Sequence, residues 1–172
     1  IALIFFNTSC SKKEEKISII EEESLEMQMI KAYNDGLKEL DKGDVIYAAK
    51  KFNEAELLYP QSEWAPKAVL LAAYSFYSQN YYERAIFEIN RFIKKYPNYE
   101  NIDYAHFLLA MCYYENIVDE KKDLEPLLLS KEKFEYVIKN YPDTDFAQDS
   151  IYKIGLIQDV LASKEIYIGK YY

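Results

Sequence analysis

Two residue types in this chain could do chemistry, namely histidine and cysteine. His106 is the only histidine, and no set of partners stands at the spacing of a zinc site or a catalytic triad. Cys112 lies in an apolar run and is interpreted as a buried core thiol. The acidic runs 21–23 and 119–120 are interpreted as solvated rather than calcium-binding, and 4 scattered glycines form no phosphate loop. The sequence therefore predicts no catalytic residue, no metal site and no enzyme.

The composition points to a helical domain that does not bind nucleic acid. Half of the 172 residues are hydrophobic, 18 are tyrosine, and there are only 4 Gly and 5 Pro, which favours long helices with few turns. The formal charge of −8 disfavours nucleic acid, which requires clustered Lys and Arg. Two cysteines make no disulfide framework.

The elements that must position any site repeat along the chain. Residues at equivalent places are 37 apart at first: Gly36, Ala73 and Ala110; Ala48 and Ala85; Phe52 and Ile89; Pro60 and Pro97. The interval then becomes 45: Ala110 to Gly155, Ala85 to Ser130, Ile89 to Phe134, Pro97 to Pro142. One insertion of 8 residues, the difference between 45 and 37, explains every shift if it lies between Ala110 and Ser130.

Helix packing explains the residue types at these positions. Paired helices need small residues where their backbones approach, and proline ends each second helix because it lacks an N–H. The pattern resembles the tetratricopeptide repeat, whose period is about 34. We therefore predict an all-α fold, an α-solenoid of helix-turn-helix repeats over residues 25–172. Three repeats are complete (about 25–62, 64–99 and 103–144), and a fourth (145–172) is truncated.

Some local features follow from the same pattern. Gly43 and Asp44 should form the turn inside the first repeat. Asp103 is expected to be an N-cap, and a second helix of the fourth repeat is expected to begin near Ser163. The small residues at the helix seams are Gly36, Ala48, Ala73, Ala85, Ala110, Ser130 and Gly155.

The first ten residues, IALIFFNTSC, resemble the end of a bacterial lipoprotein signal peptide cut just before Cys10. Their apolar run is too short to span a bilayer. The resemblance implies acyl chains, such as palmitate, on Cys10 and export to the outer membrane, with which Ser11 is compatible. Residues 11–24 then form a charged tether. An ordinary cleaved signal peptide or a buried strand is the alternative.

Aromatic residues recur on the first helix of each repeat. In tetratricopeptide solenoids these helices line the concave face, so a strip of aromatic side chains is expected along a groove that suits extended peptides. The candidates for this peptide groove are Tyr33, Tyr74, Tyr77, Tyr104, Phe107 and Tyr114.

A closer resemblance rests on RFIKKYPNYENIDYAHFLLAMCYYE (91–115), YPQSEWAPKAVLLAAYSFY (59–77) and the acidic insertion. These runs resemble the BamD family, also called YfiO/ComL, of outer-membrane β-barrel assembly lipoproteins. The resemblance implies a scaffold of five repeats, lipid-anchored on the periplasmic face of the outer membrane of Gram-negative bacteria. Its implied partners are BamA, other lipoproteins of the machinery, and unfolded outer-membrane proteins with aromatic-ended targeting segments. The BamA-docking surface would lie toward the C-terminal repeats, which are expected beyond residue 172.

Two other interpretations belong to different classes. One is another periplasmic tetratricopeptide scaffold, such as the Tol-associated cell-division coordinator, although that family usually lacks a lipidated cysteine. The other is an envelope hydrolase that uses a repeat domain to hold its substrate. It would need a catalytic domain outside this sequence.

Overall fold

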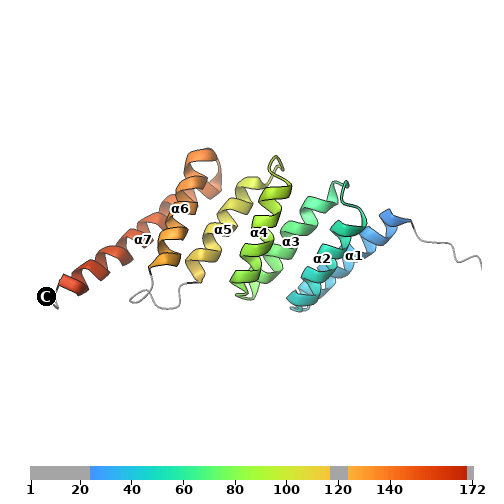
Figure 1. The fold of residues 1–172 in the computed structure, drawn as a ribbon, viewed down its shortest axis with the longest axis horizontal. Helices are drawn as coiled ribbons and strands as arrows, with labels where there is room; N and C mark the ends of the chain where they lie inside the picture. The colour runs from blue at the N-terminus through green and yellow to red at the C-terminus, as the bar shows by residue number, and fades with distance from the viewer. Residues whose placement is uncertain (1–23, 117–123, 170–172) are drawn as a thin grey trace, which may run out of the picture.

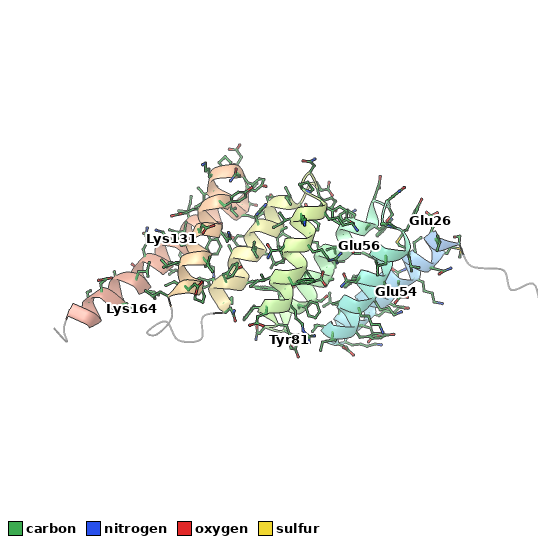
Figure 2. The ribbon with its side chains drawn as sticks, viewed as in Figure 1. Glu26, Glu54, Glu56, Tyr81, Lys131 and Lys164 are labelled. Atoms are coloured by element: carbon green, nitrogen blue, oxygen red, sulfur yellow. The ribbon has the colours of Figure 1, made fainter. Side chains whose placement is uncertain are left out.

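The computed structural model describes residues 24–116 and 124–169. Within these ranges the chain forms seven helices and no strand, arranged in a row along the long axis of the molecule (Figure 1). Glu26 on the first helix and Lys164 on the last mark the two ends of the row (Figure 2). The helices are α1 (Leu25–Asp41), α2 (Val45–Leu58), α3 (Trp64–Ser78), α4 (Tyr82–Lys95), α5 (Ile102–Glu115), α6 (Glu125–Asn140) and α7 (Asp145–Gly169).

Each helix packs against the next one in the chain. In addition, α3 contacts α5 and α5 contacts α7, so the first helices of the second, third and fourth repeats adjoin. This neighbour-to-neighbour packing is that of a stacked repeat protein. The predicted all-α solenoid is confirmed.

The turn between α1 and α2 depends on a glycine. Gly43 has φ of +82°, a left-handed conformation in which a side chain would be strained. Asp44 follows it and accepts a hydrogen bond from the Tyr47 N–H at 3.1 Å, which caps α2. The turn and the start of α2 are therefore fixed by two adjacent residues.

A Tyr-Pro pair follows each second helix. The tyrosine N–H still donates to the carbonyl four residues back, at 3.3, 2.8 and 2.9 Å in α2, α4 and α6. The proline has no N–H to continue the ladder, so the helix stops. The pairs are Tyr59-Pro60, Tyr96-Pro97 and Tyr141-Pro142.

The helix seams are filled by small residues beside large ones. Gly36 on α1 is buried against the ring of Phe52 on α2. The Ser130 hydroxyl of α6 donates to the Ala110 carbonyl of α5 at 3.1 Å. The other fully buried seam residues are Ala48, Ala73 and Ala85, with Ile89 and Phe134 beside the seams.

The fourth repeat differs from expectation in two ways. Helix α7 runs without a break through Ser163, so no second helix begins there. The Ser163 hydroxyl donates to the Asp159 carbonyl one turn back, as a serine inside a helix does, and no proline interrupts the run. Gly155 is exposed rather than at a seam, because no described helix packs over it.

Asp103 is not the N-cap of α5. The cap is Asn101, and the helix already includes Ile102, whose N–H donates to the Tyr99 carbonyl at 3.1 Å. The Asp103 carboxylate instead accepts from the N–H of Tyr104 at 2.8 Å inside the first turn. An acidic residue there still stabilises the helix, because the N-terminal end of the helix dipole is positive.

Candidate functional site

An aromatic pocket of about 400 Å³ lies on the first helices of the repeats. Its lining comes from α1, from α3, and from the loop before α5 together with the start of α5. Its lining residues are Tyr33, Lys67, Leu70, Leu71, Tyr74, Tyr99, Asn101 and Tyr104.

Tyr33 is the wall from α1 and is fixed by two other rings. Its ring packs edge-on against Phe52, with centroids 5.6 Å apart, and against Trp64, with centroids 5.0 Å apart. Burial raises the pKa of Tyr33. A wall held on two sides is pre-organised for a ligand.

The opposite side of the pocket is more open. Tyr74 is 40% exposed, whereas the other three wall tyrosines are half-buried. Tyr104 packs against Phe146 of α7 at 5.4 Å between centroids. Burial first, and then the nearby Tyr74 and Tyr77, raise the pKa of Tyr104 to about 12. The exposed Tyr74 ring is therefore the part of the wall that an incoming ligand meets first.

Two polar groups stand among these rings. The Tyr99 hydroxyl oxygen is buried, yet it has no hydrogen-bond partner of ordinary length among the described residues. Burial, followed by the charge of nearby Glu100, raises the pKa of Tyr99, and a side-chain hydrogen bond with Glu100 adds to the rise. The exposed Lys67 ammonium lies 5.6 Å from the centre of the Trp64 ring. An apolar hollow with a nearby cation suits a ligand that has an aromatic group and a carboxylate.

The six predicted groove residues do not all share this pocket. Tyr33, Tyr74 and Tyr104 line it. Tyr77 packs against Tyr82, with centroids 6.0 Å apart, and burial raises its pKa to about 12. Their role in binding stays a prediction.

The other two groove candidates belong to the packing of the third repeat. Phe107 contacts Phe134 at 5.9 Å and Phe146 at 5.3 Å between ring centroids. Tyr114 contacts Phe134 at 6.4 Å and holds the Lys153 ammonium over its ring at 4.4 Å. Both rings are half-buried between helices and contribute first to the fold.

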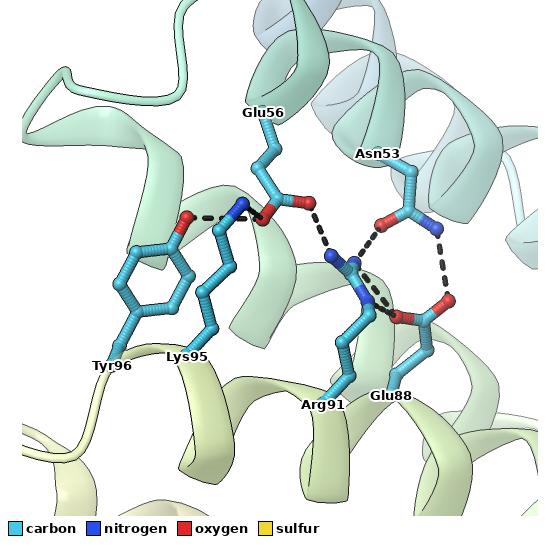
Figure 3. Close-up of polar contacts among 6 residues, drawn as sticks. All are labelled: Asn53, Glu56, Glu88, Arg91, Lys95 and Tyr96. Carbon is cyan, nitrogen blue, oxygen red and sulfur yellow. Dashed lines mark hydrogen bonds and ion pairs between the residues drawn. The ribbon is translucent and has the colours of Figure 1, made fainter.

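A polar network between α2 and α4 was not predicted (Figure 3). Glu56 of α2 is 1% exposed, and it pairs with Arg91 and, at 2.6 Å, with Lys95 of α4. It also accepts from the Tyr96 hydroxyl at 3.0 Å. Burial alone would raise the pKa of Glu56, but the hydrogen bonds from Lys95 and Arg91 outweigh it and lower the pKa.

The second half of the network surrounds the same arginine. Arg91 also donates to Asn53 at 2.7 Å and to Glu88 at 2.9 Å, and the Asn53 amide donates back to Glu88 at 2.9 Å. Burial lowers the pKa of Arg91, but its bonds to Glu56 and Glu88 outweigh this effect and raise the pKa.

The sequence held one signal of this network, since Glu56 stands four residues after Phe52 on the buried face of its helix.

The residues that first suggested chemistry lie elsewhere. His106 stacks with Tyr136 and Tyr141 of the third repeat, at 4.5 and 5.8 Å between ring centroids. Burial, followed by Lys133, lowers the pKa of His106, and burial raises the pKa of the Cys112 thiol to about 12. Both are packing residues.

Two further observations concern metals and membranes. No three His, Cys, Asp or Glu side chains in 24–116 and 124–169 come together as a metal site. None of the helices in this part of the chain has the length and apolar character needed to cross a membrane. Cys10, the predicted lipidation site, and the tether lie outside the described residues.

The chain is similar to one family model and to several curated proteins. Residues 25–172 match the family model described as YfiO, outer membrane lipoprotein. Curated relatives include the outer membrane protein assembly factor BamD of Caulobacter vibrioides, 35% identical over 164 residues, 95% of this chain and 52% of the relative. The protein of the same name from Rickettsia prowazekii is 41% identical over 140 residues, 81% of this chain and 56% of the relative. The chain thus spans about half the length of these relatives.

Proposed function

The chain belongs to the YfiO family of outer membrane lipoproteins, and we propose that it acts as a non-catalytic scaffold in outer-membrane β-barrel assembly. The names of its relatives, outer membrane protein assembly factor BamD, support this role. A row of stacked helices offers a long surface for other chains.

The anchor and the docking partners follow from the family resemblance. Acyl chains on Cys10 would hold the protein on the periplasmic face of the outer membrane, and more than one chain is needed for stable anchoring. BamA and the other lipoproteins of the machinery would dock on the repeats. Mass spectrometry of the mature N-terminus should find a lipid-modified Cys10, and an unmodified chain cut elsewhere would reject the anchor.

The pocket is the proposed contact for unfolded outer-membrane proteins. The observation that carries this proposal is the aromatic hollow with the exposed Tyr74 ring and with Lys67, whose ammonium lies beside Trp64, among its lining residues. An aromatic side chain of an extended peptide would fill the hollow, and a carboxylate of the same peptide would pair with the exposed Lys67 ammonium. Ordering a flexible peptide offsets much of the gain, so we expect micromolar affinity, around −8 kcal/mol.

Peptide titration tests the pocket. The probe is a fluorescent peptide of roughly ten residues, the length of one barrel strand, that ends in phenylalanine. Tyr74→Ala removes an exposed ring and should weaken binding about tenfold, as expected for an aromatic hot spot. The matched control is Tyr152→Ala on α7, which removes a tyrosine that is 67% exposed and outside the pocket. Equal binding by folded Tyr74→Ala and the unmodified chain would contradict the assignment.

A further inference from the structure

The two outer walls of the pocket are held by two buried phenylalanines. Tyr33 packs edge-on against Phe52 of α2, with centroids 5.6 Å apart. Tyr99 packs edge-on against Phe92 of α4, with centroids 5.8 Å apart and an interplanar angle of 87°. Phe52 and Phe92 are both fully buried, so the positions of these two walls follow the positions of α2 and α4.

The network of Figure 3 joins those same two helices. Glu56 stands one turn after Phe52, and Arg91 is the neighbour of Phe92. Helices α2 and α4 do not pack extensively against each other, so side chains span the space between them. The ion pairs of Glu56 with Arg91 and Lys95, and the bonds of Asn53 with Arg91 and Glu88, tie the two helices directly.

Tyr96 connects the network to the pocket directly. Its hydroxyl donates to Glu56 at 3.0 Å, and its ring lies 5.7 Å from Phe92 between centroids. Its carbonyl accepts from the N–H of Tyr99 at 3.1 Å, so one residue touches the network, the core ring and the pocket loop.

Stability alone does not account for such a network. A buried ion pair loses hydration, and replacing one with apolar side chains of similar size is often neutral or stabilising. Charged side chains that form hydrogen bonds add a fixed relative geometry of the two helices, because each hydrogen bond requires a certain angle and distance, which apolar contact does not. A pocket whose walls come from different helices needs that kind of constraint.

We propose that the α2–α4 network sets the distance between the Tyr33 and Tyr99 walls, so that Glu56 and Arg91 are positioning residues for the pocket ligand without touching it. The inference rests on the proposed peptide-binding function of the pocket. It predicts that loss of the network weakens peptide binding and moves Tyr33 relative to Trp64.

The test uses three variants of the full chain and two readouts. Glu56→Gln removes the charge and keeps the shape. The double variant Glu56→Met, Arg91→Met replaces the ion pair with apolar contact of similar size, and Glu88 then keeps its bond to Asn53 alone among its described network partners. Ser130→Ala is the matched control, because it removes a buried bond between helices α5 and α6 far along the row. The readouts are the affinity for the phenylalanine-ended peptide and the emission of Trp64, the only tryptophan, which contacts Tyr33.

Both network variants should bind the peptide roughly two- to thirtyfold more weakly, the range of coupling through packed networks, and should shift Trp64 emission without peptide. At a temperature where all chains are folded, Ser130→Ala should change neither the peptide affinity nor the emission of Trp64. If Glu56→Gln and the double variant bind as tightly as the unmodified chain, the proposal is overturned. If the unmodified chain binds no peptide, the proposed function fails. The emission of Trp64 then tests the positioning role of the network separately, and an unchanged emission spectrum in Glu56→Gln would overturn that role.

Discussion

Gly36 on α1 faces Phe52 on α2 so closely that a Cβ atom added to Gly36 would lie 2.7 Å from Phe52 Cε1. Real Cβ atoms essentially never approach a ring atom to this distance. The Phe52 ring is fully buried and is also packed by Tyr33, so it has little room to move. This contact sets how closely the first two helices approach.

Gly36→Ala should therefore destabilise the protein. Alanine favours a helix over glycine by about 1 kcal/mol, but overpacking a buried seam costs about 1–3 kcal/mol. We expect a net loss of about 1 kcal/mol or more in urea unfolding. The control is Gly155→Ala, at the equivalent repeat position on α7, where a Cβ meets nothing within 4 Å. That change should stabilise by up to about 1 kcal/mol. A gain in both variants would show that the Gly36 seam is loose.

Glu56→Gln should lower stability at neutral pH but not in acid. The pKa of Glu56 is lowered in the folded state, so its ionisation contributes stability above the ordinary value of 4.5. That contribution is lost as the pH falls through the lowered pKa. We expect a loss of roughly 1–3 kcal/mol at neutral pH, and a smaller difference well below pH 4.5. Urea unfolding at neutral pH and well below pH 4.5 measures the free energy of unfolding in each case.

Glu54→Gln on the same helix is the control for that experiment. Glu54 is only partly buried and pairs with Lys51 at 2.8 Å at the surface, a kind of contact that contributes about 0–1 kcal/mol. If Glu56→Gln lowers the free energy of unfolding by the same amount in acid, the Glu56 side chain acts through its shape rather than its charge.

Lys67 should favour a peptide with a free C-terminal carboxylate. Its ammonium is at the pocket, beside Trp64, and an exposed ion pair contributes about 0.2–1 kcal/mol. The free acid should therefore bind about two- to fivefold tighter than the same peptide amidated. Lys67→Gln should remove that preference, whereas Lys31→Gln on α1, outside the pocket, should keep it. A preference that survives Lys67→Gln would place the carboxylate elsewhere.

Cys112 should resist thiol reagents while the protein is folded. It is fully buried, and burial raises its pKa to about 12, so almost no thiolate forms at mildly alkaline pH. Iodoacetamide labelling, with the site located by mass spectrometry, should modify Cys112 only after urea is added. Rapid labelling of the native chain would reveal opening of the α3–α5 core.

The fold could be predicted because its signals are local and repeated. Alanine at 48, 85 and 110 and proline at 60, 97 and 142 each report a backbone requirement that sequence spacing carries directly. The interval change from 37 to 45 predicted an insertion between Ala110, which lies on α5, and Ser130, which lies on α6. The break expected near Ser163 was wrong, because serine is tolerated inside a helix when its hydroxyl bonds the preceding turn.

The site could be predicted only in part, because helical spacing does not say which helix meets a ring. Tyr77 and Phe107 have the same periodicity as Tyr74 and Tyr104, yet Tyr77 meets Tyr82 and Phe107 meets Phe134. The network was hidden for a related reason. Its members, Glu56 and Arg91, are 35 residues apart and have no charged counterparts at the matching positions of the next repeat, so the repeat pattern does not reveal them.

The nearest-neighbour packing of the helices has a consequence for how the chain forms. Because each helix rests mainly on the one beside it in sequence, few long loops must close before contacts form, and chains with such short-range contacts fold quickly. Folding can start at any helix pair and spread outward. A polypeptide threaded through a membrane from its N-terminus could therefore complete α1 and α2 while α7 is still unfolded, and the first repeat would not depend on the last to become structured.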